Sequence, residues 1–148
     1  MGITILFLLS SCRKNEKAKT AELCRELENS VMLSPAFDSL VKVSMGLPNF
    51  FRSKVLLTAG SCYSTRVEQM QQARIYLREA YRIAPRDVKN LVALELPRLY
   101  GSLILRDSCV EEAIRFISRV PSKVVFTREE EAKFYYLGAC FFKSIDID

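Results

Sequence analysis

Residues 59–85 read AGSCYSTRVEQMQQARIYLREAYRIAP, and the order of small, large apolar and charged residues in this stretch decides the fold class. Ala73, Leu77 and Ala80 recur at the spacing of one helix face, and most residues between them are polar or charged. Pro85 cannot continue a helix, because it lacks an amide donor and clashes with the preceding turn. The stretch therefore predicts an amphipathic helix that ends before this proline, with another helical segment ahead of it.

A similar order of small and large apolar residues recurs further along the chain, with one extra residue between the two halves of the first unit. A glycine after an apolar residue is followed by an aromatic or aliphatic residue, and then by alanine on the next helix. The first unit has Ala59-Gly60, Tyr63, Ala73, Leu77, Ala80 and Pro85; the second has Tyr100-Gly101, Ile104, Ala113 and Ile117; the third begins with Phe134, Leu137-Gly138 and Phe141. We expect the glycines and alanines to lie where two helices cross closely.

This pattern resembles the two helices of the tetratricopeptide repeat, over roughly residues 54–142. The resemblance implies an all-α fold, a short α-solenoid of antiparallel helical hairpins. The repeats are irregular, because the glycines lie 41 and 37 residues apart whereas the family repeat is about 34 residues long. A generic helical bundle is the alternative.

Cap and turn residues mark the other helix ends. Ser34-Pro35 favours a helix start, and Gly46-Leu47-Pro48 favours a stop. Three hydroxyl residues are followed three positions later by glutamate, a pattern typical of the capping box, so we expect helices to begin near residues 66, 109 and 128. These pairs are Thr65 with Glu68, Ser108 with Glu111, and Thr127 with Glu130.

Pro97 lies inside the helical run from Asp87 to Leu105, so we expect a kink or break there. Pro121 is expected to close the helix that precedes it. No stretch sustains an alternation of period two, so a strand is expected at most around Val124–Phe126. An earlier apolar stripe predicts a first helix with Thr20, Cys24, Leu27 and Val31 on one face.

The first twelve residues resemble a targeting signal. The apolar run Ile3–Leu9 is far shorter than the roughly 20 residues that span a bilayer as a helix, but it has the length of a signal-peptide core. Leu9-Ser10-Ser11-Cys12 resembles the lipobox of bacterial lipoproteins, which implies that Cys12 is acylated. The alternative is that Ile3–Leu9 is a short buried strand or helix turn.

The expected organisation is a signal segment over 1–12, a polar tether over 13–19 and a helical-repeat domain over 20–148. The lipobox resemblance implies a lipid anchor in a bacterial cell envelope, on the outer membrane or facing the periplasm. A cytoplasmic protein is the alternative. A chain truncated at either end would also fit the sequence.

The composition favours a non-catalytic protein. Histidine is absent, which removes the commonest general base and every histidine-containing zinc site. No glycine-rich phosphate loop or pair of cysteines in a CxxC motif occurs, so we expect no cofactor and no metal. The remaining cysteines are expected as free buried thiols, with disulfides as the alternative: Cys24, Cys62, Cys109 and Cys140.

The tetratricopeptide resemblance implies that a partner protein or peptide binds the surface formed by the first helices of the hairpins. The family's lining positions fall here on a mixed, mildly basic set: Lys54, Leu57, Ser61, Ser64, Glu95, Arg98, Ser102, Arg106, Tyr135, Phe142 and Lys143. The family's clamp for a C-terminal carboxylate is missing, because Leu57 and Ser61 occupy its positions.

The segment Phe134–Phe142 is apolar nearly all round, so something is expected to cover it. A homodimer partner, another protein, the N-terminal segment or residues beyond a truncated end would each do so. Phe141 and Phe142 are the expected contacts.

Arg74, Arg78, Arg82 and Arg86 recur every four residues in a chain with a net charge of +5. This stripe is either an ordinary solvated helix face or a docking site for phosphate or acidic groups, because arginine offers forked donors. The sequence thus favours a protein-binding scaffold anchored to a membrane by lipid. The alternatives are a cytosolic helical-repeat subunit of a larger complex and a binder of nucleic acid or another anionic partner, with nucleic acid the less favoured.

Overall fold

The structure is a computed structural model that describes residues 2–30, 34–103 and 109–145, with side chains for residues 12–30, 35–103 and 109–145. Every regular element in this part of the chain is helical, which confirms the all-α prediction. The α-helices are α1 Gly2–Ser30, α2 Ser34–Val43, α3 Asn49–Ser64, α4 Met70–Ile83, α5 Arg86–Leu103, α6 Val110–Arg119 and α7 Arg128–Ile145. Short 3-10 helices are η1 Ser44–Gly46, η2 Val67–Gln69 and η3 Val120–Ser122.

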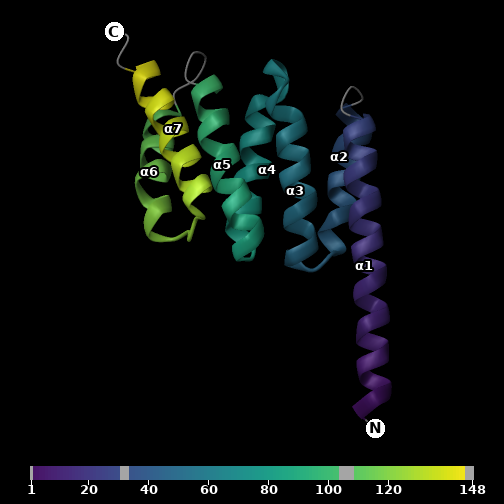
Figure 1. Cartoon of the computed structure of the whole chain (residues 1–148). Helices are drawn as coiled ribbons and strands as arrows, with labels where there is room; N and C mark the ends of the chain where they lie inside the picture. The colour runs from purple at the N-terminus through teal and green to yellow at the C-terminus, as the bar shows by residue number, and fades with distance from the viewer. Residues whose placement is uncertain (1, 31–33, 104–108, 146–148) are drawn as a thin grey trace.

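The helices stand side by side in a row, and successive helices run in opposite directions (Figure 1). Along one layer α1 packs against α3, α3 against α5, and α5 against α7. The other layer consists of α2, α4 and α6. Of these, α2 packs against α1, α4 packs against both α3 and α5, and α6 packs against α5. The second half of α1 makes these contacts, with Thr20, Leu23 and Leu27 buried.

Helices α3 and α4 pack closely at Gly60, where the lack of a side chain leaves room for Leu77. A Cβ atom added to Gly60 would lie 2.5 Å from Cγ of Leu77, which is fully buried. The close crossing predicted at Gly60 is therefore confirmed. The same prediction is wrong at Gly101, where an added Cβ would meet nothing within 4 Å.

Aromatic and polar side chains join α2 to this pair. The rings of Phe37 and Tyr63 stack with centroids 4.1 Å apart. The Tyr76 hydroxyl donates to Oδ1 of Asp38 at 2.7 Å, and the Tyr63 hydroxyl lies 3.5 Å from the same atom. Burial and the hydrogen bond to Asp38 raise the pKa of Tyr76 above its ordinary value.

Of the three predicted capping boxes, the one before α7 is confirmed. The Glu130 amide donates to the Thr127 hydroxyl at 3.2 Å, and the Thr127 amide donates to the Glu130 carboxylate at 2.8 Å. The prediction at Thr65 is wrong: its hydroxyl donates instead to the carbonyl of Cys62 at 2.9 Å, and α4 begins only after η2. Ser108 lies outside the described residues, although α6 begins close to the expected position.

The proline predictions have mixed outcomes. Helix α4 ends before Pro85, and α6 gives way to η3 at Pro121, as expected. Of the kink or break predicted at Pro97, the break is wrong, because α5 continues through this residue from Arg86 to Leu103, and the kink stays a prediction. Residues 124–126 form no strand. Val31, Ile104 and Arg106 lie outside the described residues.

Candidate functional site

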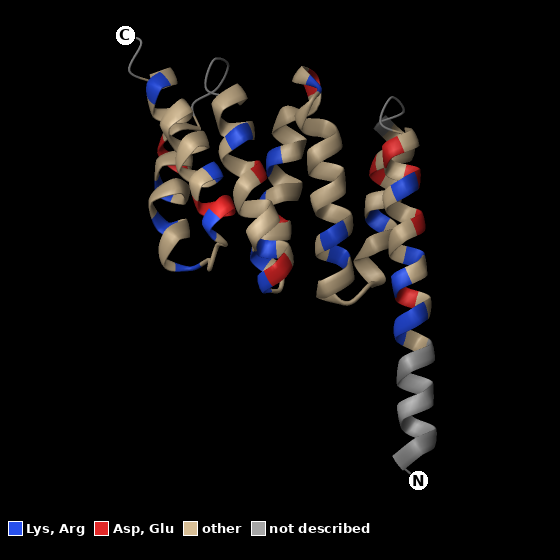
Figure 2. Cartoon of the chain, in the orientation of Figure 1, with Lys and Arg blue, Asp and Glu red and all other residues tan. Residues whose placement is uncertain are grey.

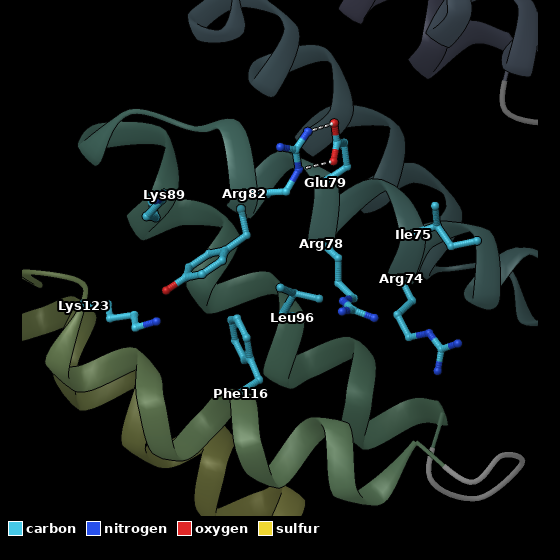
Figure 3. Close-up of a pocket in the computed structure, with 10 residues that line it drawn as sticks. Arg74, Ile75, Arg78, Glu79, Arg82, Lys89, Leu96, Phe116 and Lys123 are labelled. Carbon is cyan, nitrogen blue, oxygen red and sulfur yellow. Dashed lines mark hydrogen bonds and ion pairs between the residues drawn. The ribbon is translucent and has the colours of Figure 1, made fainter.

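A groove opens between α4 and α6 above α5 (Figure 3). It consists of two adjoining hollows, with volumes of about 640 and 420 Å³, which share Arg78, Tyr81, Phe116 and Lys123. We call this the α4–α6 groove. Its other lining residues are Arg74, Ile75, Glu79, Arg82, Lys89, Leu96, Tyr100, Glu112, Arg115, Arg119 and Val120.

The centre of the groove is apolar. Leu96 of α5 is buried below it, and the half-buried rings of Tyr81 and Phe116 meet edge to face with centroids 5.1 Å apart. Figure 3 shows Leu96 and Phe116 between Lys89 and Lys123 on one side and Arg74 and Arg78 on the other. A ligand in the groove would thus contact an apolar centre with charged groups on both sides.

Cationic side chains outnumber carboxylates around this centre. Basic and acidic residues are interleaved over the described helices (Figure 2). The groove differs from this pattern because it has more cations than carboxylates. Its two carboxylates are Glu79 and Glu112. Its cations are Arg74, Arg78, Arg82, Lys89, Arg115, Arg119 and Lys123.

Glu112 connects the groove's three helices. Its carboxylate accepts the Tyr100 hydroxyl at 2.6 Å and Nη1 of Arg78 at 3.0 Å, and Nη1 of Arg74 lies 4.0 Å away. Burial and this hydrogen bond raise the pKa of Tyr100, so the phenol stays protonated and keeps donating to the carboxylate. One carboxylate therefore serves two arginines, which leaves most of their donors available.

Glu79 occupies the rim of the groove. Both of its oxygens accept from Arg82 at 2.8 Å, and Arg52 lies 3.4 Å away. The Arg82 guanidinium lowers the pKa of Glu79, so this pair remains ionised near neutral pH. Arg82 is thus turned along α4 toward Glu79 (Figure 3).

The other cations of the groove have no carboxylate within ion-pair distance among the described residues. The Lys89 ammonium lies 5.2 Å from the ring centroid of Tyr81, and Nε of Arg115 donates to the backbone carbonyl of Glu111 at 3.3 Å. Arg119 and Lys123 are exposed. These groups can pair with an incoming anion at little cost in existing interactions.

The arginine stripe predicted from the sequence is only partly one surface. Arg74, Arg78 and Arg82 line the groove, whereas Arg86 is the first residue of α5 and is exposed away from its lining. Sequence reasoning missed the groove's apolar centre and the basic residues of α6. Periodicity along α4 could not reveal them, since Leu96 and the residues of α6 come from segments later in the chain.

On the surface predicted from the first helices of the hairpins, several side chains form hydrogen bonds with one another. Ser64 is buried, and its hydroxyl accepts from Nη2 of Arg98 at 2.8 Å, while the same guanidinium donates to Glu95 at 2.7 Å. Ser61 and Leu57 are half-buried, whereas Ser102 is exposed. Lys54 is exposed, with its ammonium 4.4 Å from the ring centroid of Phe50. Neither hollow of the α4–α6 groove includes these residues.

Helix α7 places the neighbouring residues Phe141 and Phe142 in different surroundings, although both are expected partner contacts. Phe141 is fully buried and belongs to the core, as does Phe134. The prediction that Phe141 contacts a partner is therefore wrong. Phe142 is 38% exposed, and Tyr135, Tyr136, Cys140 and Lys143 are exposed with it. An outward apolar face on α7 therefore remains.

The cysteines are free thiols. Cys109 is buried and Cys24 and Cys62 are half-buried, and desolvation raises the pKa of both half-buried thiols. Cys140 is exposed, contrary to the buried position expected for it. Cys12, the predicted acylation site, is exposed on α1.

Comparisons with protein-family models, with curated proteins and with solved structures find no match for this chain. In the described residues, no group of three or more potential metal-ligating side chains comes together. No described helix has both the length and the apolar character needed to cross a membrane.

Proposed function

We propose that this protein is a non-catalytic scaffold of tetratricopeptide-like helical hairpins that binds another protein. The observation that carries the proposal is the α4–α6 groove, an open hollow that combines an apolar centre with cations lacking local carboxylate partners. Each of its two hollows, of about 640 and 420 Å³, lies within the range of about 300–1,000 Å³ that is usual for ligand sites. The serial packing of α1, α3, α5 and α7 supports the hairpin-repeat interpretation.

We further propose that the exposed face of α7 receives a second copy of this chain. Tyr136 lies midway along this face, with Glu129 toward one end and Lys143 toward the other. If two copies of α7 packed antiparallel about Tyr136, each Glu129 would meet the Lys143 of the other copy. Such a symmetric interface would bury the exposed rings and pair opposite charges twice.

A photo-crosslinking amino acid placed at Ile75, at Tyr136 or at Ser39 tests both proposals in living cells of the source organism. All three residues are exposed or half-exposed, and Ser39 on α2 lies outside both surfaces. We expect Ile75 to give an adduct with one discrete partner protein, Tyr136 to give a dimer of this chain, and Ser39 to give neither. Failure of Ile75 to yield any protein adduct would refute the groove as a protein-binding site.

Binding of nucleic acid is the second candidate function. The rings of Tyr81 and Phe116 lie beside several cations, and basic grooves with aromatic side chains are typical of proteins that bind single strands. The same experiment separates the candidates, because an adduct at Ile75 whose added mass is removed by nuclease would favour nucleic acid.

We also propose that Cys12 is acylated and tethers the scaffold to a bacterial envelope membrane. Support comes from Leu9-Ser10-Ser11-Cys12 and from the exposure of Cys12 and of most of the polar residues after it. Intact mass of the protein from the membrane fraction of a bacterial host should show loss of residues 1–11 and addition of acyl groups. A soluble species that retains these residues would instead favour the cytosolic subunit of a larger complex.

A further inference from the structure

We propose that the α4–α6 groove recognises an acidic linear segment of a partner protein that carries one large apolar side chain among its carboxylates. This inference rests on the proposed protein-binding function and names the chemistry of the bound segment. It commits to a peptide partner, although other anions share part of that chemistry.

The apolar requirement follows from the groove's centre. Leu96 lies at its floor, and the rings of Tyr81 and Phe116 remain only half-buried. A Phe or Leu side chain that entered between these groups would remove apolar surface from water on both partners. Burial of one such side chain typically strengthens binding by about 10- to 100-fold.

The acidic requirement follows from the cations around that centre. Lys89, Lys123, Arg115 and Arg119 have no carboxylate partner among the described residues. They lie along α5, α6 and the segment after η3, so carboxylates of an extended segment could meet them in succession. Arginine would bind such carboxylates through paired donors, and lysine as a point charge.

Two features favour a peptide over a nucleic acid strand. Glu79 and Glu112 line the groove. Their carboxylates would repel the continuous row of phosphates of a nucleic acid strand. A peptide can instead place uncharged residues opposite them. The aromatic rings are also poor platforms for bases. Tyr81 and Phe116 meet edge to face, and the Lys89 ammonium lies over the Tyr81 ring.

Fluorescence anisotropy on the full chain with defined probes tests the inference. The first probe is a short labelled peptide with one central phenylalanine between two runs of alternating Asp and Glu. We expect it to bind in a salt-dependent manner, and we expect a peptide with serine in place of phenylalanine to bind about 10- to 100-fold more weakly. A labelled oligothymidylate of the same charge should bind more weakly than the phenylalanine peptide.

Two double variants locate the site. Arg119→Glu with Lys123→Glu should weaken peptide binding at least about tenfold, because both side chains lie in the groove and are exposed. Arg13→Glu with Lys17→Glu makes the same change of net charge on an exposed part of α1 and should leave binding nearly unchanged. Thermal unfolding of both variants checks that each remains folded.

Several results would overturn the inference. Equal affinity for the phenylalanine and serine peptides, or tighter binding of oligothymidylate, would mean that the groove senses charge alone. Equal losses in the two double variants would place binding outside the groove. No peptide binding at all would also refute it, whereas a protein adduct at Ile75 in cells would still support the broader scaffold function.

Discussion

Replacing Phe141 by alanine is expected to lower the free energy of unfolding by about 3–5 kcal/mol. The Phe141 side chain is fully buried on the inner face of α7, together with Phe134 and Gly138. Its removal would leave a cavity that the surrounding helices can fill only in part. Chemical denaturation followed by far-UV circular dichroism measures the change, and the variant should unfold at a clearly lower denaturant concentration.

Phe142→Ala is the matched control for this prediction. The two rings are neighbours in sequence and contact each other with centroids 5.3 Å apart, but Phe142 is 38% exposed. We expect its replacement to change stability by no more than about 1 kcal/mol. If both variants were equally destabilised, the two faces of α7 would not differ as the structure indicates. Phe142→Ala is instead expected to weaken self-association of the chain.

The difference between Phe141 and Phe142 marks a limit of sequence reasoning about this fold. Residues 134–142 are apolar nearly all round, so no hydrophobic stripe distinguishes the inner face of the helix from the outer one. Packing against other helices determines which face of α7 is buried. Helix α7 lies against α5, and Gly138 approaches Cγ2 of Ile117. These contacts depend on residues far away in sequence.

Helix boundaries show the same limit on a local scale. Thr127 and Thr65 are each followed three residues later by glutamate, but only Thr127 caps a helix. After Thr65 the chain forms η2 before α4 begins, so the hydroxyl bonds backward to the helix that it ends. The motif describes which hydrogen bonds are possible, and the connection between α3 and α4 decides which of them form.

The candidate site could be predicted only in part for a related reason. Spacing along one helix identified Arg74, Arg78 and Arg82 as a possible anion-binding stripe. Glu112, which pairs with Arg74 and Arg78, and the ring of Phe116 belong to α6, more than thirty residues after those two arginines in the chain. Only the packing of α4 and α6 on α5 converts a charged helix face into a groove with an apolar centre.

Gly60→Ala is expected to have the second large effect on stability, because Gly60 lies where α3 packs closely against Leu77 of α4. An added methyl group would lie 2.5 Å from Cγ and 2.7 Å from Cδ2 of Leu77. Because Leu77 is fully buried, its side chain cannot move aside without displacing α4 or other core groups. We expect a loss of about 1–3 kcal/mol from overpacking, even though alanine favours a helix by about 1 kcal/mol over glycine.

Gly101→Ala is the control, because it makes the same chemical change in a helix where an added Cβ meets nothing within 4 Å. Only the helix-propensity term remains there, so this variant is expected to be unchanged or stabilised by up to about 1 kcal/mol. Gly60→Ala should therefore lower the denaturation midpoint, whereas Gly101→Ala should leave it unchanged or raise it. A Gly60→Ala variant with an unchanged or raised midpoint would mean that α3 and α4 do not pack as closely as the structure indicates. Opposite signs would establish that the two glycines have different roles despite their matching sequence context, one required by a helix crossing and the other only tolerated.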